Sequence, residues 1–372
     1  MKTKILHVSQ ATGGVETSLL LLFRHLDRRR FDIHLACPPG TGLAAKASRL
    51  GVSVFEIPMV RRADPFWDVL ALLGLARLIR RERYAAVHAH SAKGGYLGRL
   101  AARLVPGPRT IYVPQAFSYL SQTGVARRVF LGLERLAVPW TDVLHASSES
   151  EKARAVREVG FPDARVVVIP NSVDIEEAEA VQKGESPTEP IVLTVGRLAY
   201  QKNPEMFVRV ARRVLDRRPG TGFVMAGAGF ASPLEQQVKS LVRVSGVADH
   251  VRIVPWADRA ETLRLVATCS VFALTSRYEG LPYSLLEAMM LRKPAVATDV
   301  DGSRDVLAGS VGGFLVPPDD DVAMANRIVA LLEDPALARR TGEAGFQRVR
   351  ECYDIRKTVQ AIEALYGELL GA

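Results

Sequence analysis

The chain has 372 residues, which is long for one domain and suits two domains of about 180 residues each. Hydrophobic residues make up 48% and charged residues 24% of the chain, a composition that excludes an intrinsically disordered protein. The three cysteines, Cys37, Cys269 and Cys352, lie far apart without C-x-x-C spacing. That pattern argues against a disulfide framework or a zinc site and favours a reducing compartment.

The N-terminus follows its two lysines with too few apolar residues for a signal-peptide core. No run approaches the roughly 18 apolar residues of a transmembrane helix. We therefore expect a cytoplasmic protein.

The net charge of +9 is concentrated in the first part of the chain. Residues 1–150 contain 21 Lys and Arg against 10 Asp and Glu, whereas the rest contains 28 against 30. A basic half indicates an anionic partner, either lipid or a phosphorylated substrate, or else a solvated basic surface with no partner. No RNA-binding aromatic signature, zinc finger or recognition-helix pair accompanies the charge, so we expect no nucleic-acid partner.

Short β-branched runs alternate with amphipathic helical stretches along the whole chain, which is typical of parallel sheets wound with helices. In the first half the expected strands are 4–9, 32–37, 52–57, 85–90, 109–113, 142–147 and 165–170. Residues 174–190 lose the apolar period and gather Glu, Gly, Ser and Pro, which predicts a linker. Strands resume at 191–196, 222–227, 251–255, 270–275, 294–298 and 313–317.

This order predicts an α/β protein of two Rossmann-like domains, residues 1–170 and 171–372, facing a cleft where ligands bind at the carboxyl ends of the strands. The final helix, 355–370, has a strong 3.6-residue apolar period. It either closes the second domain or packs back on the first.

Two strand-to-helix turns have the composition of anion sites. Gly13 and Gly14 follow the first strand and allow close approach of a phosphate to the amides of the next helix. The spacing is not G-x-G-x-x-G, so a dinucleotide is not indicated, and a turn without a ligand stays possible. In the second domain Arg197 and Lys202 follow a strand and precede a helix capped near Asn203. Two such cations can hold a diphosphate, although they can also be plain surface charges.

Glu279 and Glu287 lie in an otherwise apolar run, with Gly280, Leu281 and Pro282 after the first acid. If the strands before 197 and 279 are neighbours, both acids face Arg197 and Lys202. The turn at Gly280 and Leu281 would then offer backbone amides at the start of a helix, and Glu287 would suit a ribose diol. A capping carboxylate and a surface glutamate are the plainer alternative.

Six motifs occur in order and together resemble the retaining glycosyltransferases of family 4, over nearly the whole chain. They are "GGVE" at 13–16, "HAHS" at 88–91, "IPNSVD" at 169–174, "VGRL" with "QKN" at 195–203, "EGLPYSLLEAM" at 279–289 and "GFLVPPDD" at 313–320. The resemblance implies the GT-B fold and transfer of a hexose-type sugar, with retained configuration, from a nucleoside-diphosphate sugar.

The same resemblance implies roles for single residues. Arg197 and Lys202 would neutralise the donor diphosphate, Glu287 would bind the ribose, and Glu279 would contact the transferring sugar. Gly14, beside Gly13, would approach the phosphates from the first domain. Because cations and helix N-termini stabilise the leaving nucleotide in such enzymes, it also implies no metal and no other cofactor.

The chain departs from the family pattern at two places. Where many relatives have His-Gly-Phe, this chain has Gln115-Ala116-Phe117, so the role of that histidine passes to Gln115 or to His90. Where relatives have two glycines, Asp301 replaces the first. Asp299 and Asp301 form a literal D-x-D that could hold Mg²⁺, but we favour a capped turn.

Trp256, in "VPWADR" at 254–259, lies where relatives place the nucleotide base. A nucleotide-sugar 2-epimerase and a catalytically silent sugar-nucleotide binder share this fold and stay open as alternatives. UDP fits better than GDP as the donor nucleotide.

The helix at 65–81 combines Phe66, Trp67 and a broad apolar face with a basic end at Arg80 and Arg81. This composition suits a helix on an anionic membrane surface, although a core-facing helix with a basic tip fits too. Members of the family that the chain resembles often glycosylate lipid-linked or polysaccharide-precursor acceptors. Together with this helix, the resemblance predicts a polyprenyl-diphosphate-linked acceptor in envelope polysaccharide synthesis and peripheral association with the inner face of the membrane.

Overall fold

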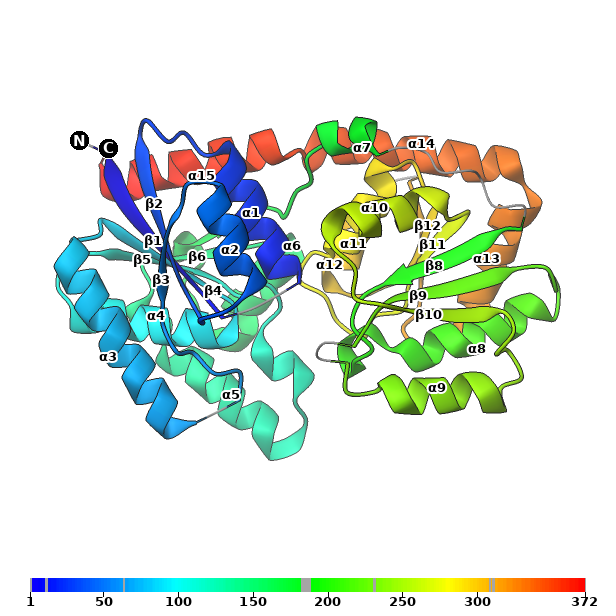
Figure 1. Cartoon of the computed structure of the whole chain (residues 1–372), viewed down its shortest axis with the longest axis horizontal. Helices are drawn as coiled ribbons and strands as arrows, with labels where there is room; N and C mark the ends of the chain where they lie inside the picture. Colours follow the sequence, from blue (N-terminus) through cyan, green and yellow to red (C-terminus); the bar gives the residue numbers. More distant parts are fainter. Residues whose placement is uncertain are drawn as a thin grey trace. The chain divides into compact units, whose positions relative to one another are not determined.

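The computed structural model describes residues 2–10, 13–62, 64–181, 189–229, 232–307, 309 and 312–371. The chain forms two compact units (Figure 1). Unit 1 contains residues Met1–Asn171 and Ile355–Ala372, and unit 2 contains residues Ser172–Asp354.

Unit 1 is built on a parallel sheet in the order β3-β2-β1-β4-β5-β6-β7. Its strands are β1 (Thr3–Ser9), β2 (Phe31–Cys37), β3 (Ser53–Glu56), β4 (Ala86–His90), β5 (Arg109–Val113), β6 (Val143–Ala146) and β7 (Val166–Val168). Strands buried on both faces need apolar or neutral side chains at successive positions, and β4 is buried at every residue.

Helices cover both faces of this sheet. They are α1 (Gly14–His25), α2 (Gly42–Arg49), α3 (Pro65–Glu82), α4 (Ala92–Leu104), α5 (Gly124–Leu136), α6 (Glu149–Arg154) and α15 (Ile355–Leu370). The final helix, left open by the sequence, belongs to unit 1. Tyr366 on α15 is fully buried and contacts the ring of Phe31 on β2.

The alternation of side chains along the strands separates the two helical layers. Phe23 of α1 and Tyr366 of α15 contact His7 and His88, which face one side of the sheet. On α4, Gly98 lies against Ala89 and Val8, which face the other side because side chains alternate along a strand. The helices α3, α4 and α5 lie together on that second side (Figure 1).

Unit 2 has a six-stranded parallel sheet in the order β10-β9-β8-β11-β12-β13. Its strands are β8 (Ile191–Val195), β9 (Gly222–Ala228), β10 (Val251–Pro255), β11 (Val271–Leu274), β12 (Ala295–Thr298) and β13 (Phe314–Val316). Its helices are α7 (Glu176–Ala180), α8 (Pro204–Leu215), α9 (Glu235–Val244), α10 (Arg259–Thr268), α11 (Tyr283–Met290), α12 (Asp301–Leu307), α13 (Asp321–Glu333) and α14 (Pro335–Cys352). All thirteen predicted strands are present, and their ends differ from the predicted ends by at most two residues.

The segment predicted as a linker, residues 174–190, differs in part from that prediction. Residues 176–180 form the short helix α7 within unit 2, and 182–188 lie outside the described residues. Among the described residues, no helix is both long enough and apolar enough to cross a membrane.

Candidate functional site

The topology of unit 2 creates a switch point at the centre of its sheet. From β8 the chain moves to β9 and β10 on one side, and then returns to β11 on the other side. The loops after β8 and β11 therefore leave the sheet side by side at its carboxyl edge, where open parallel sheets bind ligands. These are the loops that carry Lys202 and Glu279.

Glu279 is buried at this edge and accepts three side-chain hydrogen bonds. Lys202 Nζ lies 2.6 Å from its Oε1, and Ser276 Oγ lies 2.5 Å from the same atom. Gln201 Nε2 donates to Oε2 over 3.3 Å. Only 5% of Glu279 is exposed. The predicted adjacency of the two loops is correct for this pair, and the carboxylate is fixed by three partners.

The backbone around Lys202 is held in place by the next residue. Asn203 adopts a left-handed conformation (φ 49°) and caps α8 by accepting from the amide of Met206. Its Nδ2 donates to Asp319 Oδ1 over 2.7 Å. The hydroxyl of Thr275 donates to the carbonyl of Lys202 over 2.8 Å. The sequence predicted this cap, and it sets the direction in which Lys202 leaves the loop.

Two glycines allow close packing around the site. A Cβ at Gly196 would lie 3.0 Å from Cε of Lys202, so the lysine stem lies against bare backbone. A Cβ at Gly302, on α12, would lie 2.0 Å from the carbonyl oxygen of Gly280. The turn of Gly280 and Leu281 that precedes α11 therefore lies directly on α12. No side chain caps α11 at Pro282.

Glu287 on α11 has a partner that the sequence analysis did not single out. It pairs with Arg259, the first residue of α10, and Arg259 Nε also donates to Glu177 on α7 over 2.8 Å. Burial raises the pKa of Glu287 above its ordinary value, and Arg259 opposes that rise. Burial alone would lower the pKa of Arg259, but Glu287 and Glu177 together raise it.

The sequence predicts that Glu287 faces Arg197 and Lys202. Its ion-pair partner is Arg259, and the charge of Lys202 also acts on its carboxylate. Arg197 lies half-buried on the loop after β8, and Trp256 follows β10 with 48% of its surface exposed. Arg259 was present in the motif "VPWADR", and its position at a strand end was the signal that could have identified it.

In unit 1 the turn between β1 and α1 contains Gly13 (φ 73°) and Gly14. No side chain caps the helix at Gly13. The first-turn acid Glu16 pairs with Lys46 on α2, whose Nζ lies 2.8 Å from its Oε1.

The loop after β5 is strained where Gln115 stands. Gln115 and Ala116 have φ values of 50° and 74°, which are costly for residues with a side chain. The buried carboxylate of Glu151 holds this loop, because it accepts from the amide of Ala116 and from the amide of Ser147, both over 2.7 Å. Strain that the surroundings maintain is common at ligand-binding loops, and Gln115 is half-buried there.

His90 lies in a buried chain of hydrogen bonds rather than on an open surface. Its Nε2 lies 3.0 Å from His7 Nδ1, and the other nitrogen of His7 lies 3.3 Å from the hydroxyl of Tyr366. That hydroxyl lies 2.8 Å from His88 Nδ1. Burial lowers the pKa of His7 to about 3 and the pKa of His88 and His90 well below the ordinary value. The imidazoles are therefore neutral at physiological pH.

Within the described ranges, these three histidines are also the one group with the ligand spacing of a metal site. Their nitrogens lie within 4.8 Å of one another. Asp299 of the D-x-D sequence instead pairs with Arg304, whose Nε lies 2.7 Å from Oδ1, and Asp301 begins α12. The arginine neutralises one of the two carboxylates that the alternative Mg²⁺ site required.

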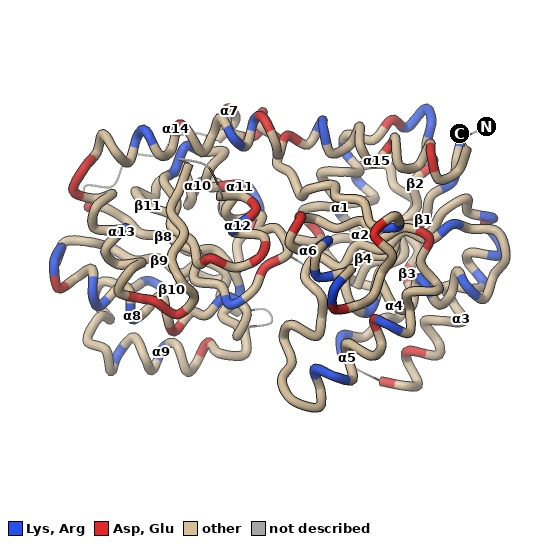
Figure 2. The backbone as a smooth tube through the Cα atoms, turned by 180° about the vertical axis from the view of Figure 1, so that it is seen from behind, with Lys and Arg blue, Asp and Glu red and all other residues tan. Residues whose placement is uncertain are grey.

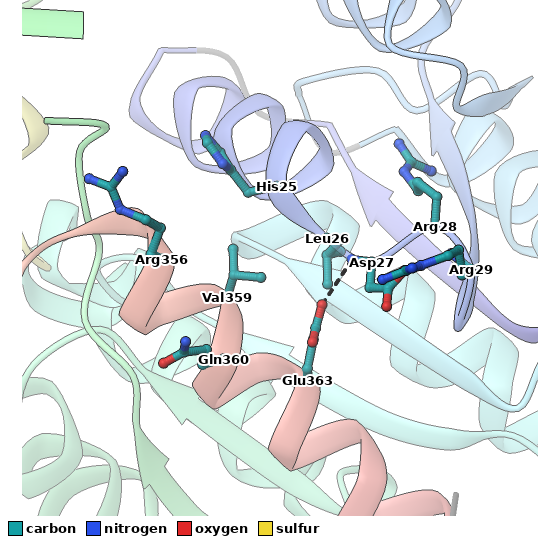
Figure 3. A pocket seen from close by; sticks show the side chains of 9 residues that line it. All are labelled: His25, Leu26, Asp27, Arg28, Arg29, Arg356, Val359, Gln360 and Glu363. Atoms are coloured by element: carbon teal, nitrogen blue, oxygen red, sulfur yellow. Dashed lines mark hydrogen bonds and ion pairs between the residues drawn. The ribbon is translucent and has the colours of Figure 1, made fainter. Parts of the chain in front are cut away.

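A surface hollow lies at the opposite edge of the unit 1 sheet (Figure 3). It is bordered by the end of α1, the turn into β2 and one side of α15. The amide of Asp27 donates to Glu363 across it over 2.9 Å. Because α1 runs back from the carboxyl ends of the strands, this hollow is distant from Gly13 and Gln115 and is not our candidate site.

Two family models together match residues 12–348. The model of glycosyltransferase family 4 matches residues 12–177, and the model of glycosyl transferases group 1 matches residues 175–348. An Escherichia coli UDP-Gal:alpha-D-GlcNAc-diphosphoundecaprenol alpha-1,3-galactosyltransferase is 28% identical, over 99% of this chain and 98% of that protein. Alpha-D-kanosaminyltransferase from Streptomyces kanamyceticus is also 28% identical, over 81% and 82%.

Solved structures share the fold. Sucrose-phosphate synthase from Thermosynechococcus elongatus superposes with a TM-score of 0.87 at 20% identity, over 100% of both chains. HepE from Anabaena, solved in complex with UDP-glucose, gives a TM-score of 0.83 at 18% identity, over 98% of this chain and 99% of that chain. With the two parallel sheets, these likenesses confirm the predicted GT-B architecture.

Proposed function

The chain belongs to glycosyltransferase family 4, and we propose that it is a retaining hexosyltransferase that uses a UDP-sugar in preference to a GDP-sugar. The observation that carries the proposal is the buried pair of Lys202 and Glu279 at the switch point of unit 2. Departure of a nucleoside diphosphate builds negative charge, and a fixed ammonium group at this edge stabilises that charge.

We propose roles for the other donor residues, which their positions support. Arg197 lies on the same loop as Lys202, and the two cations bind the diphosphate together. Arg259 holds the carboxylate of Glu287 in one orientation, which suits two hydrogen bonds to a ribose diol. The amides of Gly280 and Leu281 add donors.

We propose that Trp256, which is exposed, stacks on the base, and that the amides after Gly13 and Gly14 bind a phosphate.

Glu279 contacts the transferring sugar, with its carboxylate oriented by Ser276 and Gln201. Of the two candidates for the missing histidine, Gln115 is favoured over His90. Gln115 is half-buried on a strained loop at the carboxyl edge, whereas His90 is 3% exposed and bonded to His7. A neutral amide donates a hydrogen bond to a sugar hydroxyl without needing to change protonation.

The acceptor we propose is a polyprenyl-diphosphate-linked sugar in envelope polysaccharide synthesis. The Escherichia coli relative named above acts, by its name, on a sugar linked to diphosphoundecaprenol. Other relatives are named for O-antigen and lipopolysaccharide core biosynthesis. The basic surplus of residues 1–150 supports an anionic acceptor (Figure 2).

We extend the proposal to peripheral binding at the inner face of the membrane. Phe66 is 66% exposed and Trp67 is 40% exposed at the start of α3, while Arg80 and Arg81 are exposed near its end. A helix with exposed aromatic residues and basic residues suits the interface of an anionic bilayer.

Calorimetry with UDP and GDP, with and without EDTA, tests the donor assignment. We expect UDP to bind more tightly, and EDTA to leave the affinity unchanged. Binding that EDTA abolishes would favour a metal at Asp299 and Asp301. Proton NMR of the product then tests the chemistry: an α-linked donor should give an α-linked product. Inversion, epimerisation at C2 without transfer, or binding without turnover would each contradict the proposal.

A further inference from the structure

Helix α5 has its polar and apolar sides reversed relative to the core. Five of its large apolar side chains are at least one-third exposed: Val125 (74%), Val129 (53%), Phe130 (36%), Leu133 (40%) and Leu136 (57%). Among its thirteen residues, all of which are described, the buried one is a carboxylate, Glu134. Water is a poor environment for the outward side of such a helix.

The reversed orientation is fixed by a buried polar network. Glu134 accepts from Arg99 Nη2 over 3.0 Å and from the hydroxyl of Tyr112 over 2.9 Å. Arg99 on α4 is completely buried, stacks over the Tyr112 ring at 3.6 Å, and donates from Nε to the carbonyl of Gly95. If α5 rolled to bury its apolar side, Arg99 would lose its counter-charge inside the protein. The apolar side therefore stays outside.

The charged residues around the exposed apolar side of α5 are mainly basic. The one acid of α5 is Glu134, which faces inward, whereas Arg128 is exposed. Arg127 and Arg135 are engaged with Glu158, through its carboxylate and its carbonyl. On α3, in the same helical layer of unit 1, Phe66, Trp67, Val69, Leu70 and Leu73 are exposed beside Arg77, Arg80 and Arg81.

These observations select one partner. A second copy of the chain, joined through α5 about a two-fold axis, would bring like arginines together. An anionic lipid surface offers acyl chains for the apolar residues and phosphates for the arginines.

We infer that α5 lies in the interface of an anionic bilayer, with Val125, Val129, Phe130, Leu133 and Leu136 toward the acyl chains and Arg128 at the headgroup phosphates. The inference rests on the proposed function and adds to it, because α5 becomes the second membrane-binding helix beside α3.

The position of α5 relates this membrane contact to the loop of Gln115. It follows the loop of Gln115 by only nine residues, and the short helix Ser118–Ser121 in between packs on α5. A bilayer at α5 would place the headgroup region next to the strained loop that we assign to the sugar site. A lipid-linked acceptor could then reach that loop without leaving the membrane.

Vesicle co-sedimentation tests the inference, with phosphatidylglycerol-containing and pure phosphatidylcholine vesicles. The variant Val129→Ser/Phe130→Ser should weaken partitioning to the anionic vesicles at least about tenfold, since two interfacial apolar groups are lost. The matched control is Val244→Ser/Val322→Ser, which changes two exposed valines of unit 2 and should alter partitioning less than about twofold. Unchanged partitioning of the α5 variant would overturn the inference.

Two further measurements separate the alternatives. Sedimentation velocity would detect a dimer if the chain forms one. A dimer that is lost in Val129→Ser/Phe130→Ser would assign α5 to self-association and overturn the lipid assignment. Calorimetry with UDP on the same variants tests the donor site independently. Normal UDP binding with lost partitioning supports both proposals, whereas partitioning without UDP binding by wild type would refute only the proposed function.

Discussion

The two units share one winding pattern but bury different polar groups beside the central strands of their sheets. At the carboxyl edge of unit 2, charged side chains are paired, as in Lys202 with Glu279 and Arg259 with Glu287. Under α1 and α15 of unit 1, the buried polar groups are neutral imidazoles, and the surplus arginines lie outside. A paired cation can exchange its carboxylate for a diphosphate, so this edge of unit 2 suits the charged donor that we propose. Unit 1 offers hydrogen bonds and an apolar exterior instead.

Two helices of similar length show a second contrast, in the side that each turns to the core. On α8 of unit 2 the apolar side is buried, as at Phe207, Val210 and Val214. On α5 of unit 1 the apolar side is exposed and a glutamate is inside. The same amphipathic period therefore serves a core in one unit and an external surface in the other.

The largest effect is expected from Lys202→Ala. The substitution removes the cation proposed to face the leaving diphosphate and leaves Glu279 buried without its counter-charge. Turnover should fall about 10²–10³-fold, the usual loss when one preorganised charge-stabilising group is removed. Steady-state kinetics and UDP calorimetry measure it. Lys239→Ala, which breaks an exposed pair with Glu235 on α9, is the control and should leave turnover near wild type. Equal activity of the two variants would refute the site.

A second large effect is expected from Gly302→Ala, and it is specific to the packing of unit 2. The new Cβ would lie 2.0 Å from the carbonyl oxygen of Gly280, and backbone must move to admit it. Overpacking of this kind costs about 3 kcal/mol of unfolding free energy, measured by urea denaturation. Gly220→Ala is the control, since nothing lies within 4 Å of its added Cβ. A donor KM unchanged in Gly302→Ala would show that the turn at Gly280 does not contact the donor.

The neutral histidines of unit 1 predict a loss of stability in acid. The pKa of His7 is about 3 and that of His145 about 4 in the folded protein, because burial disfavours the charged form. An unfolded histidine, with a pKa of roughly 6.5, takes up its proton first as the pH falls. Stability is therefore complete above pH 6.5 and is lost as the pH falls toward 4 and 3. At pH 5 each buried histidine costs about 2 kcal/mol.

Urea unfolding at pH 7.5 and pH 5 checks this expectation. His145→Gln should reduce the pH-dependent loss by about 2 kcal/mol, because one titrating group is gone. Gln236→Asn, at an exposed position of unit 2 that does not titrate, is the control and should not change the loss. A loss that is the same in both variants would contradict a neutral histidine cluster.

The fold was predictable because β-branched runs mark every strand and turn residues separate them. The Lys202–Glu279 pair was predictable too, since it needs only that β8 and β11 are neighbours. The role of Arg259 was not predictable, because its ion pair with Glu287 depends on how α10 packs against α11. The burial of His90 depends on α15, whose location the sequence left open. Periodicity groups the apolar residues of α5, but Arg99, 35 residues from Glu134, decides which side faces inward.

The smallest effect concerns Asn203, which connects the fold of unit 2 to the direction of Lys202. Its left-handed backbone is tolerated by Gly but not by Ala, and its side chain caps α8. Asn203→Gly should therefore cost only the cap and the bond to Asp319, about 1 kcal/mol. Asn203→Ala should cost about 1 kcal/mol more, because Ala disfavours a positive φ. If backbone geometry at 203 directs Lys202, the donor KM should rise more in the Ala variant than in the Gly variant.

Asp334→Ala, which removes the cap of α14, is the control for a cap that lies outside the site. It should lower stability by a similar 1 kcal/mol and leave the donor KM unchanged. Equal KM values for Asn203→Ala and Asn203→Gly would reduce Asn203 to a structural cap.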